Sequence, residues 1–294
     1  MKRNNKIVSY SLCSWLLLLV FCMQFVVSLC AKNLWAVLST RSLSRYDYIL
    51  LTQIFAVALP CLLMCLYNRS GFRKTFSIKA LNFYKLWNCI GLGICLQPAA
   101  ILLNIPLQKF MDGGGAMVAA PSSMNDVVTM ILFICLVPAV CEEFLLRGMV
   151  LTSVKRKGYA FSIIVTTLMF VLLHGDASSA LGHAVLGAAA TFAVLNTNSV
   201  FAGVLVHFSF NFSGIMIDYI TNKFYVQGGY VGSFEFFVLL GIAGIVLSCL
   251  FFRGVHSKKV KKYHSDDLLY NLWKAFFNIP VIIFLAMYIL RIVL

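Results

Sequence analysis

Long apolar segments are the feature that most limits what this chain can fold into. A series of them runs along the 294 residues, at about 11–30, 48–66, 86–105, 127–147, 160–174, 180–195, 199–220, 234–252 and 270–293. A helix needs about 20 apolar residues to cross the hydrocarbon of a bilayer. In lipid the backbone must also satisfy its own hydrogen bonds, which an α-helix does. The sequence therefore predicts an all-α, polytopic bundle of about eight or nine transmembrane helices, the fifth and sixth of them short.

The composition excludes a water-soluble globular protein. Hydrophobic residues make up 61% of the chain and charged residues 12%, whereas soluble domains are about half apolar and about a quarter charged. So much apolar surface could not be hidden in one core, because the outside would have to be apolar as well. We expect a multi-pass protein of a cell membrane, the plasma membrane of a bacterium, with the lipid bilayer as its constant partner.

The net charge of +14 indicates contact with lipid headgroups rather than with nucleic acid. The basic residues form short runs between apolar segments, at 2–6, 69–85, 155–157 and 253–262, and no soluble basic domain is present to hold a duplex. Loops of this kind face the cytoplasm in most membrane proteins. The alternation of basic-rich and basic-poor loops continues through every segment, which predicts a cytoplasmic N-terminus.

The first apolar segment is predicted to remain as a membrane span. Lys2, Arg3 and Lys6 precede a run from Leu12 to Leu29, which could also be read as a signal peptide. The run is long for a signal peptide, and Leu29-Cys30-Ala31 is a poor cleavage site. We therefore expect no cleavage here.

Two adjacent carboxylates lie inside the fourth apolar segment. Glu142 and Glu143 occur in Val137-Pro138-Ala139-Val140-Cys141-Glu142-Glu143, and Arg147 follows Glu143 by four residues. Ionisable groups inside membrane spans are costly and mark functional sites by default. Residues four apart share a helix face, so Arg147 is predicted to pair with Glu143 and support the helix. Glu142 lies about 100° around the helix and is left free to act on another group.

Two histidines and an asparagine are the other buried polar groups of interest. His174 ends the fifth segment, and His207 and Asn211 lie four apart in the seventh. At about 1.5 Å per residue, Glu143 and His174 lie ~18 and ~25 Å from the basic turn at 155–157, and His207 lies ~15 Å from the polar turn at 196–198. The three groups can therefore meet at mid-membrane depth.

These residue types suit hydrolysis of a peptide bond. Glu142 with His174 could take a proton from water, and His207 with Asn211 could stabilise the oxyanion that forms. Alternatively, Glu142, His174 and His207 could hold Zn²⁺ with a water molecule as fourth ligand. The residues by themselves leave both versions open, and Zn²⁺ is the only cofactor they suggest.

Three motifs resemble those of the CPBP family, the CAAX-protease and bacteriocin-processing intramembrane peptidases. They are Glu142-Glu143-x-x-x-Arg147, Phe170-x-x-x-His174 and His207-x-x-x-Asn211, each in its own apolar segment. The resemblance implies an intramembrane endopeptidase, either glutamate-dependent or a metalloprotease, acting on a peptide or a membrane protein. It implies that Glu142 and His174 activate water and that His207 and Asn211 form the oxyanion hole. It also implies a role in peptide or bacteriocin maturation, or in immunity.

On this basis the chain divides into three parts. Residues 1–126 are predicted to hold about three N-terminal helices, residues 127–220 the helices of the catalytic core, and residues 221–294 about two C-terminal helices. Other interpretations remain for the polar residues. They could form a transporter or proton relay, although the inverted repeat of many transporters is absent from the sequence. They could equally brace a non-catalytic immunity or scaffold protein. His183, in the sixth segment, matches no motif and is expected to pack or to support the site.

Overall fold

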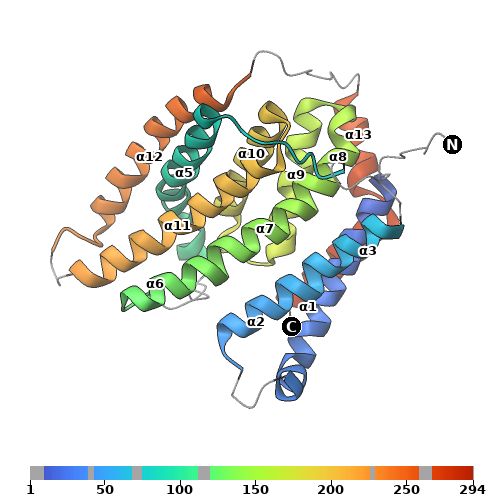
Figure 1. Ribbon diagram of the computed structural model, residues 1–294, viewed down its shortest axis with the longest axis horizontal. Coiled ribbons are helices and arrows are strands. Elements are labelled where there is room, and N and C mark those ends of the chain that lie inside the picture. The colour runs from blue at the N-terminus through green and yellow to red at the C-terminus, as the bar shows by residue number, and fades with distance from the viewer. Residues whose placement is uncertain are drawn as a thin grey trace.

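The computed structural model describes residues 10–38, 43–67, 75–111, 120–225, 229–257 and 267–293 (Figure 1). Throughout these ranges the regular elements are helices, with no strand, which confirms the predicted all-α class. The basic residues at 2–6, 69–74 and 258–262, on which the predicted orientation partly depends, lie outside the described residues.

The helices follow the predicted apolar segments, extended by a few residues at most ends. Two of the long runs are interrupted by π-helical stretches, labelled η. In chain order the elements are α1 (Tyr10–Leu38), α2 (Arg45–Leu51), η1 (Thr52–Ala58), α3 (Leu59–Tyr67), α5 (Phe83–Phe110), α6 (Met124–Met130), η2 (Ile131–Leu136), α7 (Val137–Glu143), η3 (Phe144–Val150), α8 (Leu151–Val154), the short 3₁₀ turn η4 (Lys155–Lys157), α9 (Tyr159–His174), α10 (Ala180–Thr197), α11 (Val200–Phe224), α12 (Phe234–Val255), α13 (Leu268–Phe276) and α14 (Ile279–Val293).

Among the described residues, seven continuous helical runs are long and apolar enough to cross a membrane. The runs Arg45–Tyr67 and Met124–Lys157 each join several of the elements above. The pair α13 and α14 would make an eighth span, and α9, with 16 residues, is apolar but shorter. The multi-pass membrane architecture is thus confirmed, with the fifth predicted segment as short as expected.

The last predicted segment is not one straight helix. A single span over 270–293 was expected, but α13 and α14 meet at an angle of 63°. Pro280 has no N–H for the carbonyl four residues earlier, so the α-helical ladder cannot run through it. The Asn278 side chain takes over both ends of the break: its Nδ2 donates to Ala275 O at 2.7 Å and its Oδ1 accepts from Val281 N at 3.3 Å.

Two π-helical stretches each end just before a proline. η1 is followed by Pro60 and η2 by Pro138. A proline inside a helix removes one backbone donor and crowds the preceding turn, and a π stretch is one way for the helix to adjust. At Pro138 the structure has the wider η2 turn directly before the helix that carries the two glutamates. Both stretches lie next to residues of the candidate site described below.

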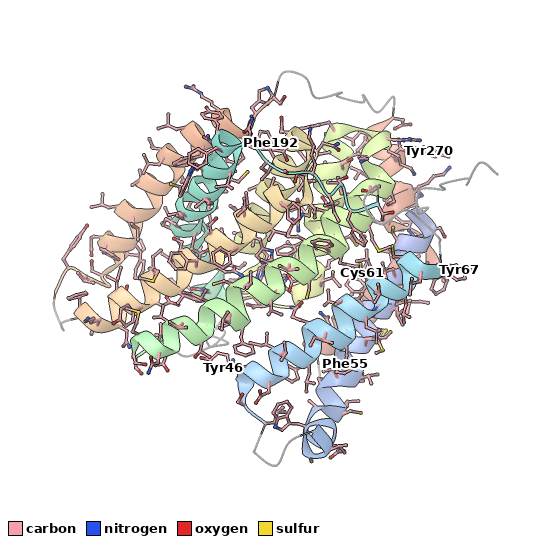
Figure 2. All side chains as sticks on the ribbon, viewed as in Figure 1. Tyr46, Phe55, Cys61, Tyr67, Phe192 and Tyr270 are labelled. Carbon is pink, nitrogen blue, oxygen red and sulfur yellow. The ribbon has the colours of Figure 1, made fainter. Side chains whose placement is uncertain are left out.

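Helix ends alternate between two sides of the molecule. In Figure 1, α1 begins and α8 meets α9 toward the upper right, whereas α2 and α6 begin toward the lower left. This arrangement is the one expected of helices that cross a bilayer in turn. Carbon makes up most of the side-chain atoms drawn on the helices in Figure 2, and Tyr67 and Tyr270, on α3 and α13, lie toward the same side of that view. Both tyrosines are exposed, as is common at membrane interfaces.

Small residues allow close packing in the middle of the bundle. Helix α5 packs against α11 and α12, and α10 packs against α9 and α11. A Cβ atom on Gly93 would overlap the backbone carbonyl of Val206, and one on Gly244 would overlap that of Cys95. Helix backbones in membranes associate through such contacts, since lipid supplies no hydrophobic drive between helices. The packing fixes α11, and with it His207, beside α5.

Candidate active site

The two adjacent glutamates end α7 and point to different partners. Glu143 is fully buried, whereas the side chain of Glu142 keeps 15% of its accessible surface. Successive residues on a helix are about 100° apart, which separates the two carboxylates as the sequence predicted. Their environments differ accordingly.

Glu143 pairs with Arg147, as predicted from their spacing. Arg147 Nη1 lies 2.6 Å from Glu143 Oε1, and both side chains have no exposed surface. Arg147 Nη2 donates to the Gly187 carbonyl on α10 at 2.8 Å, which ties the pair to a second helix. Burial of a carboxylate without a cation would cost much of the folding free energy. Glu143 can therefore be buried here only because Arg147 pairs with it.

His207 contacts the same carboxylate, which the sequence analysis did not foresee. His207 Nδ1 lies 2.9 Å from Glu143 Oε1, and the His207 side chain is 2% exposed. An ionised carboxylate only accepts hydrogen bonds, so Nδ1 carries the proton in this contact. Glu143 therefore orients His207 as well as pairing with Arg147. No spacing rule connects residues 64 positions apart, so only the fold could bring them together.

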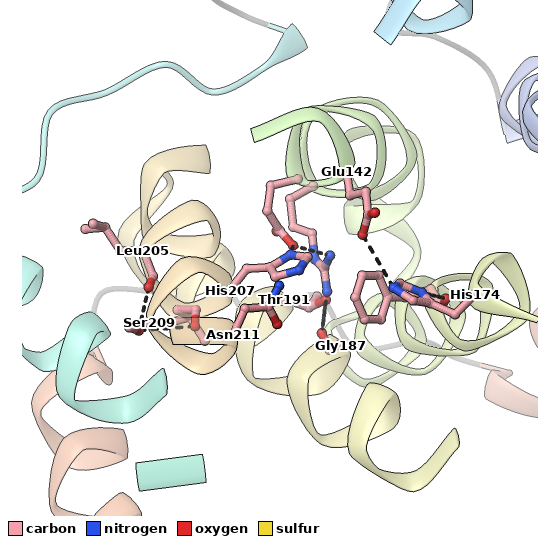
Figure 3. Close-up of polar contacts among 12 residues, drawn as sticks. Glu142, His174, Gly187, Thr191, Leu205, His207, Ser209 and Asn211 are labelled. Carbon is pink, nitrogen blue, oxygen red and sulfur yellow. Dashed lines mark hydrogen bonds and ion pairs between the residues drawn. The ribbon is translucent and has the colours of Figure 1, made fainter. Parts of the chain in front are cut away.

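Glu142 faces His174 across a short gap (Figure 3). Glu142 Oε2 lies 3.7 Å from His174 Nε2, too far for a direct hydrogen bond. His174 Nδ1 lies 2.9 Å from the Phe170 carbonyl, which can only accept, so Nδ1 carries a proton; in the neutral form of the ring Nε2 is then an acceptor. Glu142 Oε2 is buried and has no hydrogen-bond partner among the described residues. Two acceptors facing each other at this distance suit a donor, such as water, placed between them.

A turn fixes the end of α9 directly after His174. The helix ends there because Gly175 adopts a left-handed conformation, with φ of 65°. Asp176 Oδ1 then accepts hydrogen bonds from Ser178 N at 2.9 Å and Ser178 Oγ at 2.7 Å. Burial opposes the charged carboxylate, but the hydrogen bonds from Ser178 hold the pKa of Asp176 below its usual value.

Asn211 lies one turn after His207 but is bonded to backbone. Its Nδ2 donates to the Ile134 carbonyl in η2 at 3.0 Å. Pro138, four residues later, has no N–H to give to this carbonyl, and the asparagine supplies a side-chain donor to it. An amide NH₂ has two hydrogens, and the bond to Ile134 uses one of them. Figure 3 shows Asn211 and His207 projecting from the same helix.

Phe170 joins the histidines into one cluster. Its ring centroid lies 4.4 Å from that of His174 and 5.5 Å from that of His207, and Arg147 Cζ lies 5.0 Å from it. The sequence motif included Phe170 without giving it a role. Its position indicates that it separates the His174 and His207 rings and covers the guanidinium.

Two further residues reach the cluster from outside the three motifs. The His183 ring on α10 lies 4.0 Å from the His174 ring, so the expected supporting position is confirmed by contact. Gln53 on η1 donates from Nε2 to Glu142 Oε1 at 2.7 Å, which the sequence analysis missed. A single glutamine in an otherwise apolar segment was the available signal. Glu142 is thus not as free as predicted.

Metal binding requires at least a third donor near Glu142 and His174. Within the described ranges, no group of three or more His, Cys, Asp or Glu side chains is arranged to hold a metal ion. His207, the third ligand suggested by the sequence, has its Nδ1 bonded to Glu143 and its Nε2 left as a possible donor, but the described residues do not group it with Glu142 and His174. The donor set as it stands does not fit Zn²⁺, and no step below is derived through a metal.

Comparison with known proteins gives one match. Residues 124–213 match the family described as type II CAAX prenyl endopeptidase Rce1-like. No curated protein and no solved structure matches the chain significantly. The matched range contains every residue of the three motifs, from Glu142 to Asn211, and confirms the family resemblance over that part of the chain. The family supports a CAAX-type intramembrane endopeptidase as the general activity.

Proposed function

From the Rce1-like segment at residues 124–213, we propose that this chain is an intramembrane endopeptidase in which Glu142 and His174 activate water. One observation carries the proposal: Glu142 Oε2 and His174 Nε2 face each other at 3.7 Å, and with a neutral imidazole both atoms are acceptors. A water molecule between them would donate both hydrogens and turn an oxygen lone pair outward. Removal of one proton by Glu142 lets that oxygen attack a peptide carbonyl.

The reaction then requires a donor for the oxyanion and a proton for the leaving amine. We propose His207 and Asn211 as the donors, since they lie one turn apart on α11 and the His207 ring contacts Phe170, which in turn contacts His174. Because Nδ1 of His207 is bonded to Glu143, an Nε2–H donor requires the imidazolium form, for which the Glu143 carboxylate is a counter-ion. The proton taken from water passes to the leaving nitrogen, the C–N bond breaks, and an acid and an amine result.

The substrate is a peptide or a membrane protein that reaches a site buried among helices. The match to a CAAX prenyl endopeptidase-like family makes a prenylated C-terminal sequence one candidate, and an unmodified leader or bacteriocin peptide the other. The protein would act in the plasma membrane of a bacterium, in peptide maturation or immunity. Both substrates would be cleaved by the same chemistry at the site. A direct comparison of their cleavage rates therefore shows which one the protein prefers.

The test compares wild type with Glu142→Gln. Two internally quenched peptides of one sequence, with and without an S-farnesyl cysteine, are incubated with purified protein in detergent, and membrane and secreted peptides of the host are compared by mass spectrometry. Glu142→Gln removes the base, so turnover should fall by about 10²- to 10⁴-fold. Glu235→Gln, an exposed change at the start of α12, is the matched control and should retain turnover.

Three results would count against the proposal. Wild-type turnover by Glu142→Gln would remove Glu142 from the mechanism. Flux of protons or solute in proteoliposomes, without hydrolysis, would favour the transporter interpretation. A cellular immunity phenotype that survives Glu142→Gln would favour a non-catalytic protein.

A further inference from the structure

Glu142 receives a hydrogen bond from a helix outside the family-matched segment. Gln53 lies on η1, in the N-terminal part of the chain, and its side chain is buried with 7% exposure. Its Nε2 donates to Glu142 Oε1 at 2.7 Å, across 89 positions of sequence. The other carboxylate oxygen, Oε2, is the one that faces His174. The two oxygens of Glu142 therefore have separate partners.

We propose that Gln53 is a positioning residue for the Glu142 base, and this inference rests on the proposed function. A glutamate side chain can rotate about its last bond, which would exchange or tilt its two oxygens. The amide holds Oε1 in place, so that Oε2 stays directed at the water site beside His174. The site is then composite: the water-activating pair comes from α7 and α9, and its orientation from η1.

An amide suits this position beside Glu142 better than a cation would. Glu143, one residue later, is held by the cation Arg147, and its carboxylate is used as a counter-ion and anchor. A cation on Glu142 would stabilise its carboxylate and weaken it as a base. Glutamine supplies a directed N–H without a full charge. The two adjacent carboxylates thus have partners that suit different roles, one structural and one reactive.

The Gln53 amide has its oxygen left over after the nitrogen has bonded to Glu142. Its Oε1 is buried and has no hydrogen-bond partner within the described part of the chain. Buried polar atoms in folded proteins are nearly always paired, and the exceptions call for an explanation such as water or a functional role. The free oxygen lies on the same amide that contacts Glu142, so a water or a substrate N–H at the site is its natural donor.

The N-terminal helices are docked so that Gln53 keeps this position. Cys61 Sγ on α3 lies 3.3 Å from Met149 Sδ on η3, and Cys13 Sγ on α1 lies 3.8 Å from the Met149 carbonyl. Both contacts join the N-terminal helices to the run that carries Glu142. The π-helical turn η1, which carries Gln53, itself packs against α7.

The first experiment separates positioning from general stability. Gln53→Leu keeps the volume but removes the donor, and we expect kcat to fall by about 10- to 100-fold with KM within about twofold of wild type. Gln24→Leu, the same change at a half-buried position of α1, is the control and should retain kcat. Gln53→Asn has the donor on a shorter side chain and should restore kcat only in part. Unchanged kcat in Gln53→Leu would overturn the proposal.

A second variant tests whether residue 53 must donate a hydrogen bond to Glu142. In Gln53→Glu, the new carboxyl can donate to Glu142 only while one proton is shared by the pair. The variant should therefore lose activity at alkaline pH through this shared proton, in addition to the loss from deprotonation of the His207 imidazolium that both proteins have in common. The other titratable groups near Glu142 are His174 from α9, His183 from α10, and Cys141 with the Glu143–Arg147 pair on its own helix run. His207 from α11 contacts that pair, and all of these groups are the same in both proteins. An unchanged pH profile would contradict the donor role.

A third measurement does not depend on activity. We measure thermal unfolding in detergent for Gln53→Leu, Glu142→Gln and the double variant, which together form a double-mutant cycle. If the loss of Tm in the double variant differs from the sum of the two single losses, the two residues interact. If the wild type cleaves no peptide while the cycle shows coupling, the proposed function fails and positioning for catalysis fails with it, although the contact stands. If the wild type cleaves peptide and the losses add, the inference about Gln53 fails alone.

Discussion

His207 and Arg147 share one oxygen of a buried carboxylate: Glu143 Oε1 lies 2.9 Å from His207 Nδ1 and 2.6 Å from Arg147 Nη1. Through Arg147 Nη2 and the Gly187 carbonyl, the same cluster reaches α10. Glu143 therefore connects three helices and sets which nitrogen of His207 carries a proton toward it. Its role extends beyond the intrahelical pair that the spacing of the motif predicts.

Arg147→Met should destabilise the protein strongly. The change leaves Glu143 buried without its cation, and removal of one partner of a buried ion pair costs about 3–5 kcal/mol. Thermal unfolding in detergent measures the loss. Arg156→Met, an exposed change at the end of the same helical run, is the control and should have little effect. Equal stability of the two variants would contradict the assigned role of the pair.

Gly203→Ala should impair catalysis without changing any ionisable residue. A Cβ at this position would lie 2.5 Å from Glu143 Oε2 and 3.0 Å from Val194 Cγ2, so the carboxylate that orients His207 must move. A displacement of about 1 Å at such a site can lower the rate by about 100-fold. Kinetics on the quenched peptides, with circular dichroism to check helix content, provide the measurement.

Gly214→Ala is the matched control on the same helix. Its Cβ would approach Gln97 Nε2 at 2.8 Å, the far end of a flexible side chain that can move aside. Activity close to wild type is expected. If both alanine variants behaved alike, the contact between Gly203 and Glu143 would not explain the loss.

Asn211→Ala distinguishes an oxyanion donor from a structural asparagine. Removal of one oxyanion donor lowers kcat by about 10²- to 10³-fold with little change in KM. The side chain also satisfies the Ile134 carbonyl beside Pro138, so some loss of stability is expected as well. A variant that loses stability yet keeps kcat at a temperature where it is folded would show that the asparagine serves only the helix.

His183 should act through its ring rather than through its nitrogens. The ring packs on His174 at 4.0 Å, and its Nδ1 has no hydrogen-bond partner among the described residues. His183→Phe keeps an aromatic ring and should retain activity, whereas His183→Ala should lower it by about 2- to 10-fold, the scale of one aromatic contact. Steady-state kinetics test this, and a phenylalanine variant as impaired as the alanine variant would point to a role for the imidazole nitrogens.

Activity should survive removal of metal ions. We expect protein shown to be metal-free by elemental analysis after chelator treatment to cleave peptide at the untreated rate, because no third ligand is grouped with Glu142 and His174 in the part of the chain that the structure describes. Loss of activity on chelation, with recovery on addition of Zn²⁺ alone, would instead support the zinc mechanism that the sequence left open.

Several features of the site could be predicted from local spacing. Glu143 and Arg147 are four apart on one helix, so their pairing follows from helix geometry and the cost of a lone buried charge. The contact between Glu143 and His207 joins α7 to α11, and that between Gln53 and Glu142 joins η1 to α7. No periodicity relates such residues. The bend between α13 and α14 was likewise missed, because a segment with one proline, two asparagines and two basic residues is still apolar enough on average to be taken for one span.

The sequence by itself determined that the protein lies in a lipid bilayer and that its elements are helices. Apolar segments of this length must lie in lipid, and lipid requires helices. It also determined which ionisable residues lie inside apolar segments, where their burial is costly and points to a functional site. Only the tertiary structure decided how those residues are shared, with Arg147 and His207 on Glu143, and Gln53 and His174 on Glu142. The physical reason is that a hydrogen bond depends on ångström-scale positions of atoms on different helices, and those positions come from close packing at residues such as Gly93 and Gly203.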